Sequence, residues 1–212
     1  MIDRRTTIDA ALDLIAAKGW AAVGLRDIAA ASGTGLAALY AAFPSKTALV
    51  AAFMAETDAA VLDGVEPSGD PDETPRDRLF DVLMRRYDLL KPRRPALTAI
   101  AQGLARDPLA ALALRRASLR SMAAMLEAAG IPADGTRGAV RKNALAAVHI
   151  AVARIWLHDD SEDLSKTMVA LDHRLKRLEG WAQSIDKIVN FRKKKAPVEA
   201  TAAPVDAPEA PV

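Results

Sequence analysis

Residues 8–46 read IDAALDLIAAKGWAAVGLRDIAAASGTGLAALYAAFPSK, a stretch that predicts three short helices and the start of a fourth. Ile8, Leu12 and Ile15 recur at helical spacing, so they form the inner face of the first helix. Lys18-Gly19 is a helix stop signal and ends it. The whole chain follows the same helical pattern, and we predict an all-α protein of about nine helices.

The second and third predicted helices are joined by a glycine turn. Leu25 and Ile28 face inward on the second helix, and Gly33 then permits a tight turn because glycine enters the left-handed region cheaply. Pro44 blocks continuation of the third helix, and Ser45 can cap the fourth. Two helices across a tight turn can form a helix-turn-helix, which places its second helix in the major groove. On spacing alone, an ordinary helical hairpin fits equally well.

The segments ALDLIAAKGW, LRDIAAASG and LYAAFPSKTALVAAF resemble the N-terminal domain of the TetR family of bacterial transcriptional repressors. The resemblance covers about the first quarter of the chain. It implies a dimeric, all-helical protein that binds operator DNA and releases it when a small molecule enters a larger second domain. It also implies that Tyr40 and Lys46 contact DNA phosphates.

The expected recognition helix departs from the family pattern. Residues 34–42 read TGLAALYAA, in which only Thr34 and Tyr40 are polar, although direct readout relies on polar side chains. The alanines can contact thymine methyl groups. Residues 1–50 hold five basic and four acidic residues, a net charge of +1. This is a small positive charge for a domain that binds the polyanion DNA. The candidate DNA-contacting residues are Arg26, Thr34, Gly35, Leu36, Ala37, Ala38, Tyr40 and Lys46.

Composition narrows the possible functions. The chain has 212 residues, 51% of them hydrophobic and 4% aromatic, so it can bury a large core built from aliphatic side chains. It has no cysteine and 3 histidines, and it lacks phosphate-loop, nucleophile-elbow and HExxH motifs. We therefore expect neither an enzyme nor a metal or other cofactor. The N-terminus lacks an apolar signal core, so we expect a cytoplasmic protein.

Prolines, glycines and acidic runs divide the chain. We predict a helix-turn-helix domain at 1–46, a helical regulatory and dimerisation domain at 47–195, and a disordered tail at 196–212. A loop is expected at 64–75 and another through residue 138. Asp160 or Ser161 is expected to cap the last long helix. The helices expected in the second domain span residues 46–62, 75–90, 96–106, 109–129, 140–157 and 164–178.

Apolar residues on these helices suggest a ligand pocket, since the matching helices surround the ligand in the resembled family. Their low polar content predicts a small apolar or acyl-type ligand. Ordinary core packing explains each of them individually, and methionine is a common gap filler. The candidate pocket residues are Leu83, Tyr87, Leu97, Ile100, Leu104, Met122, Met125 and Trp156.

The C-terminal part carries two further expectations. The helices at 140–157 and 164–178 resemble the pair through which TetR-family proteins dimerise, and the first is apolar nearly all round. WLHDDS at 156–161 and TMVALDHRL at 167–175 are similar to the C-terminal domain of lipid-binding accessory proteins of coenzyme Q biosynthesis. That resemblance implies a TetR-like fold without a repressor's function.

A basic amphipathic segment follows Gly180. Residues 174–195 hold eight basic and two acidic residues, a net charge of +6, next to an apolar stripe. Such a helix can lie on an anionic membrane surface, or it can pack on the dimer with its lysines solvated. The candidate membrane-contacting residues are Trp181, Ile185, Ile188, Lys193, Lys194 and Lys195.

Two functions remain open at this point. The LYAAFPSK motif favours a TetR-type DNA-binding transcriptional regulator, expected to be a repressor, that responds to a small apolar ligand. The polar-poor third helix and the basic amphipathic segment favour a lipid-binding accessory protein of quinone metabolism with a vestigial helix-turn-helix. We prefer the first hypothesis because the motif is more specific.

Overall fold

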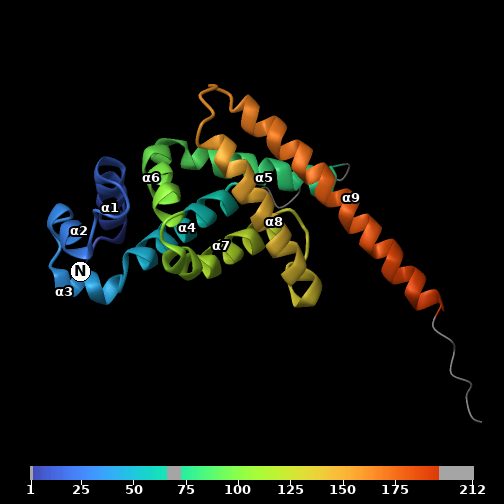
Figure 1. The fold of residues 1–212 in the computed structure, drawn as a ribbon, viewed down its shortest axis with the longest axis horizontal. Coiled ribbons are helices and arrows are strands. Elements are labelled where there is room, and N and C mark those ends of the chain that lie inside the picture. The colour runs from blue at the N-terminus through green and yellow to red at the C-terminus, as the bar shows by residue number, and fades with distance from the viewer. Residues whose placement is uncertain (1, 66–72, 196–212) are drawn as a thin grey trace, which may run out of the picture. The chain divides into compact units, whose positions relative to one another are not determined.

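The structure is a computed structural model that describes residues 2–65 and 73–195, with side chains described up to residue 180. Over this part of the chain it contains nine α-helices, one 3-10 helix and no strand, which confirms the predicted all-α fold (Figure 1). The helices are α1 (Arg4–Lys18), α2 (Leu25–Ala31), α3 (Leu36–Ala42), α4 (Lys46–Leu62), α5 (Pro75–Leu90), η1 (Lys91–Arg93), α6 (Arg94–Leu104), α7 (Pro108–Ala128), α8 (Gly135–Trp156) and α9 (Ser165–Lys195).

The first four helices begin and end where local signals predict. The Asp3 carboxylate accepts a hydrogen bond from the Thr6 amide and caps α1, which ends before Gly19 at a φ of 83°. The Ser45 hydroxyl accepts from the Ala48 amide and caps α4, as expected. Helix α4 leads from the α1–α3 group into the remaining helices (Figure 1).

Three prolines of the described residues lie in the first turns of α-helices. Pro75 and Pro108 occupy first turns, where a missing amide hydrogen costs nothing, behind the capping side chains of Thr74 and Asp107. For the same reason α6 begins at Arg94, with Pro95 in its first turn, rather than at residue 96 as predicted.

The start of α8 corrects another boundary. This helix begins at Gly135, inside the region predicted as a loop, and Gly138 lies buried in its first turn. A Cβ at Gly138 would lie 2.1 Å from the Ala133 carbonyl carbon, so only glycine lets the preceding chain fold back so closely. The glycine thus reflects close packing, not a break in the helix.

The cap of α9 also differs from the prediction of Asp160 or Ser161. The buried Asp159 carboxylate accepts hydrogen bonds from the Thr167 amide at 2.8 Å and from the Thr167 hydroxyl at 2.6 Å. Burial alone would raise the pKa of Asp159, but the hydrogen bonds from Ser161 and Thr167 outweigh it and lower the pKa to about 2. Asp159 reaches the helix because the turn through residue 164 folds back over it.

Two hydrophobic clusters organise residues 1–176, which form one compact unit. We call helices α1–α3, together with the first turns of α4, the head, and the rest of this unit the body. The head cluster centres on α1–α3 and includes residues of α4, α6 and α7, among them Ile100 and Leu114. The body cluster joins α4, α5, α7, α8 and the start of α9 around Trp156 and Tyr87. The predicted domain division at residue 46 stays a prediction, since helices on both sides of it share the head cluster.

The described residues from Arg177 to Lys195 belong to a second unit and continue α9. The predicted tail at 196–212 lies outside the described residues, as do the side chains of all six candidate membrane-contacting residues. Among the described helices, none is by itself long and apolar enough to span a membrane. Helices α3 and α4 pass that test only as a pair, with a 57° bend between them.

Candidate nucleic-acid interface

Helices α2 and α3 are joined by a turn that fixes their relative orientation. Gly33 adopts a φ of 63°, and the Thr34 amide donates to the Ala29 carbonyl at 2.9 Å while the Gly33 amide donates to the Ala30 carbonyl. These two bonds form a Schellman motif, which requires a residue in the left-handed region. Ile28 and Leu39 lie fully buried between the helices. The local chemistry therefore holds α3 against α2 as in a helix-turn-helix.

The outer side of α3 is exposed and almost entirely apolar. Leu39 anchors the helix in the head cluster, while Leu36 is 43% exposed and Tyr40 is 60% exposed. Ala37, Ala38 and Ala41 are also exposed. This surface carries one hydroxyl group and no charge. We call these five residues, Leu36, Ala37, Ala38, Tyr40 and Ala41, the α3 face.

Thr34 and Gly35, also predicted to contact DNA, lie just before the α3 face. Gly35 is exposed and occupies the N-cap position of α3. The half-buried Thr34 hydroxyl is 3.4 Å from the Ser32 carbonyl, to which it donates. Thr34 thus satisfies its polar group within the turn in the isolated chain.

Lys46 is predicted to contact a DNA phosphate, but in the structure its ammonium group is bound within the chain. Its ammonium group donates to the Trp20 carbonyl and to the Val23 carbonyl, the latter at 2.8 Å, and lies 4.1 Å from the centroid of the Trp20 ring. Burial lowers the pKa of Lys46. The side chain therefore ties α4 to the α1–α2 connection, and a phosphate contact would have to replace these bonds.

Three exposed arginines of α1 and α2 make no such bonds to carbonyl groups within the described part of the chain. Arg26 is exposed on α2, and Arg4 and Arg5 are exposed at the start of α1. The Arg4 guanidinium lies 4.5 Å from the centroid of the Phe43 ring, directly after α3. Arg4 is not among the residues that the sequence predicts to contact DNA. Its helical spacing from Ile8 gave no signal that it would meet Phe43, which is 39 positions away along the chain.

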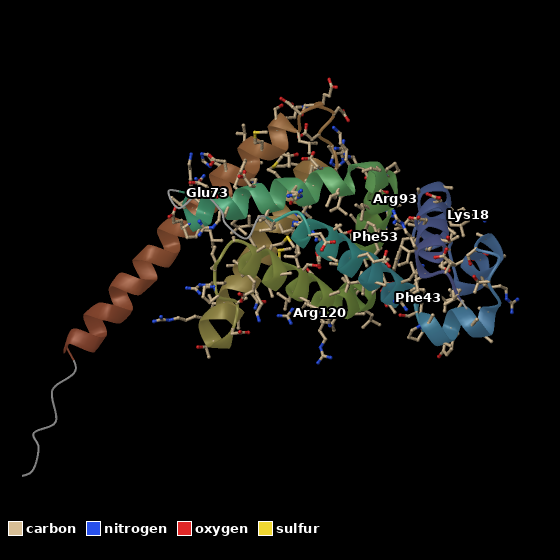
Figure 2. The ribbon with its side chains drawn as sticks, turned by 180° about the vertical axis from the view of Figure 1, so that it is seen from behind. Lys18, Phe43, Phe53, Glu73, Arg93 and Arg120 are labelled. Atoms are coloured by element: carbon tan, nitrogen blue, oxygen red, sulfur yellow. The ribbon has the colours of Figure 1, made fainter. Side chains whose placement is uncertain are left out.

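Helix α6 contacts the head at both of its ends. The Arg93 guanidinium, just before α6, bridges Asp13 on α1 at 2.8 Å and also pairs with Asp9 (Figure 2). Near the other end, a Cβ at Gly103 would lie 2.3 Å from the Trp20 Cβ, so Trp20 packs directly on the helix backbone. Any displacement of α6 must therefore strain these contacts or carry the head with it.

A groove of about 530 Å³ opens beside this contact between the head and α6. The residues along it include Lys18 at the end of α1, Lys46 at the start of α4, Gln102 on α6, and Arg106 and Asp107 in the connection between α6 and α7. It lies beside α6 rather than within the apolar interior where the ligand pocket is predicted.

The candidate pocket residues are divided between the two clusters. Leu83, Tyr87, Met122, Met125 and Trp156 belong to the body cluster, whereas Ile100 belongs to the head cluster and Leu104 packs against it. Leu97 packs against both. The eight residues therefore do not share one packed cluster, because α6 turns Ile100 and Leu104 toward the head.

The body also contains polar groups that pair with each other in its interior. The buried Arg86 forms an ion pair with Asp58, whose other carboxylate oxygen accepts from the Ser121 hydroxyl at 2.5 Å. The Tyr87 hydroxyl is hydrogen-bonded to His149 Nδ1 at 2.9 Å. Burial, together with the charge of Arg86, lowers the pKa of His149 to about 3, and burial raises the pKa of Tyr87. These residues are therefore neutral partners near pH 7.

Residues 8–53 match the family of bacterial regulatory proteins described as the tetR family. No curated protein matches the sequence. Among solved structures, a TetR transcriptional regulator from Nitrosomonas europaea is similar, with a TM-score of 0.65 and 22% identity, over 84% of this chain and 98% of that one. A TetR transcriptional regulator from Rhodococcus sp. RHA1 has a TM-score of 0.53 and 27% identity, over 82% and 96% of the two chains. These findings support the prediction of a TetR-type transcriptional regulator.

Proposed function

We propose that this TetR-type transcriptional regulator represses its target genes by binding a palindromic operator as a homodimer, and that a small apolar or acyl-type ligand releases it. The observation that carries the proposal is the α2–α3 unit, whose glycine turn and buried Ile28 and Leu39 present the α3 face at the surface. A short helix held in this way can enter the major groove.

The charged residues around the α3 face support phosphate binding. Arg4, Arg5 and Arg26 are exposed, and Tyr40 offers its hydroxyl from a side chain that is 60% exposed. Contacts to phosphates supply sequence-independent affinity and fix the register on the duplex. Lys46 is a weaker candidate than the sequence suggested, because its ammonium group already holds two carbonyl groups.

Exposed apolar side chains on α8 and α9 support a homodimer. Val140 and Ile150 on α8 are 63% and 52% exposed, and Val169 on α9 is 68% exposed. These are the two helices through which the sequence resemblance implies dimerisation. Burying such side chains against a second copy would stabilise an isologous interface, and the dimer's two-fold axis would match a palindromic operator.

The contacts of α6 support ligand control. Arg93 and Gly103 attach this helix to the head, while Leu97 packs against both clusters. A ligand that enters the apolar body and shifts α6 would change the position of the head. A ligand that prefers the conformation with the wrong spacing of the two heads draws the population away from DNA.

The alternative function is a lipid-binding accessory protein of coenzyme Q biosynthesis that touches the membrane surface. The apolar α3 face is the observation that favours it, because a DNA-reading helix ordinarily offers more polar groups. Vesicle binding by the full chain, lost on Trp181→Ala with Lys193, Lys194 and Lys195 neutralised, would support this function.

The proposal is tested by binding the full chain to random duplex DNA at increasing salt and sequencing the retained fraction. We expect a palindrome and a steep salt dependence. Arg26→Ala should lower the salt slope by about one unit, and Tyr40→Phe should weaken binding. Arg120→Ala is a matched control, since Arg120 is an exposed arginine on α7 in the body (Figure 2). Retention without an enriched sequence would contradict the proposal.

A further inference from the structure

The α3 face has a composition that restricts which bases it can read. Four of its five side chains are aliphatic, and the fifth is Tyr40. In the major groove, guanine is read by arginine or lysine and adenine by asparagine or glutamine. The α3 face contains none of these. The remaining feature that an alanine or leucine side chain can recognise there is the C5-methyl group of thymine.

The geometry of α3 places alanines at its outermost positions. Successive residues of an α-helix are about 100° apart around the axis. Measured from the buried Leu39, Ala37 and Ala41 each point about 160° away, on the side of the helix opposite the head cluster. They lie one turn apart, about 6 Å along the axis, which is close to two steps of about 3.4 Å along a DNA strand.

We propose that α3 recognises its operator mainly through thymine methyl groups, with Ala37 and Ala41 at the centre of the contact. This inference rests on the proposed DNA-binding function and names what that site reads. Because alanine side chains are short, the helix backbone can lie close to the base edges. The exposed Arg4, Arg5 and Arg26 supply affinity through phosphates, and the methyl groups supply the choice of sequence.

The test uses the full chain and the operator recovered by sequence selection. Each thymine in the protected half-site is replaced by deoxyuridine, which removes the methyl group and keeps every base-pair hydrogen bond. We expect about a fourfold loss of affinity for each contacted methyl group, which corresponds to burial of one group of methylene size at about 0.8 kcal/mol. Deoxyuridine at thymines outside the protected site is the control and should change nothing.

Protein variants assign the effect to α3. Ala37→Ser and Ala41→Ser replace an outward methyl by a polar hydroxymethyl group at exposed positions, so the fold should persist. Each variant should lose the preference for thymine at the position that its own residue contacts and keep it at the other, and the double variant should lose both. Ala17→Ser, at an exposed position of α1, is the matched control and should keep the full preference for thymine.

The outcomes separate this inference from the function on which it rests. An enriched operator whose affinity is unchanged by deoxyuridine would overturn methyl recognition and leave the DNA-binding regulator intact. The absence of any enriched operator would overturn both. Vesicle binding that is lost on Leu36→Ser, together with no specific DNA binding, would also overturn both and assign the α3 face to a lipid surface.

Discussion

The head and the body of this protein depart from the usual distribution of polar and apolar residues in opposite ways. The head exposes the apolar α3 face, including Leu36 at 43% and three alanines. The body buries Arg86 in an ion pair with the half-buried Asp58, and it buries Tyr87 in a hydrogen bond with the half-buried His149. Folded chains usually keep charges at the surface unless they are paired.

The two regions differ in whether their unusual side chains have contact partners within the chain. Each residue of the Asp58–Arg86–Ser121 set has a partner inside the chain, although the Nε atom of Arg86 has none. The α3 face has no counterpart of this kind within residues 2–65 and 73–180, since its side chains remain exposed there. Changes in the body should therefore act on stability, and changes in the α3 face on binding.

The largest expected effect comes from breaking the buried ion pair of the body. Asp58→Ala leaves Arg86 charged and unpaired in the interior, and we expect the free energy of unfolding to fall by about 3 kcal/mol. Urea unfolding followed by circular dichroism measures this change. Asp63→Ala, at an exposed position directly after α4, is the control. Equal stabilities for the two variants would show that the pair does not support the body.

The next effect tests the contact between the head and α6. Gly103→Ala places a Cβ where Trp20 now lies, and we expect a loss of about 2 kcal/mol because backbone and ring must separate. Urea unfolding again gives the value. Gly180→Ala is the control, because a Cβ there meets no atom within 4 Å. A variant as stable as the wild type would mean that Trp20 does not pack on α6 in solution.

Lys46→Met distinguishes a structural role from a DNA contact in the head. Since the ammonium group holds the Trp20 and Val23 carbonyls, its removal should lower stability by about 1.5 kcal/mol. The salt slope of DNA binding should stay unchanged. A slope reduced by about one unit, with stability retained, would instead restore Lys46 as a phosphate contact.

The smallest effect concerns pH and the body. His149 has a pKa of about 3 in the folded chain and an ordinary value near 6.5 when unfolded, so between these values only the unfolded state binds the proton. This contribution to stability is complete well above pH 6.5 and is lost as the pH falls, by about 1.4 kcal/mol at pH 5.5. His149→Gln should remove this dependence in urea titrations at pH 7.5 and 5.5. A variant with the wild-type pH dependence would assign it to other groups.

Local signals made the head predictable from sequence. Gly33 and Ser45 both act on residues three to five positions away, so their roles could be inferred without knowing the fold. Local signals gave a wrong prediction where tertiary packing decided the role of a residue. Gly138 suggested a loop but lies within the first turn of α8, because the preceding chain folds back onto it.

The candidate sites were less predictable than the helices that carry them. Exposure of Tyr40 and Arg26 agrees with their expected outward positions. Spacing could not show that Lys46 reaches carbonyls more than 20 positions away, or that α6 turns Ile100 and Leu104 toward the head. A helical repeat defines the inner face of a helix, and it does not define which neighbour covers that face.

The sequence by itself determined the helices, the glycine turn between α2 and α3, and the apolar composition of the α3 face, since these depend on residues close together in the chain. The tertiary structure alone decided the partners of Lys46, Arg93 and Asp58, which join residues 23, 80 and 28 positions apart. The physical reason is that helix formation and capping follow local backbone geometry. The pairing of distant side chains depends on how the helices pack, and many packings satisfy the same local pattern.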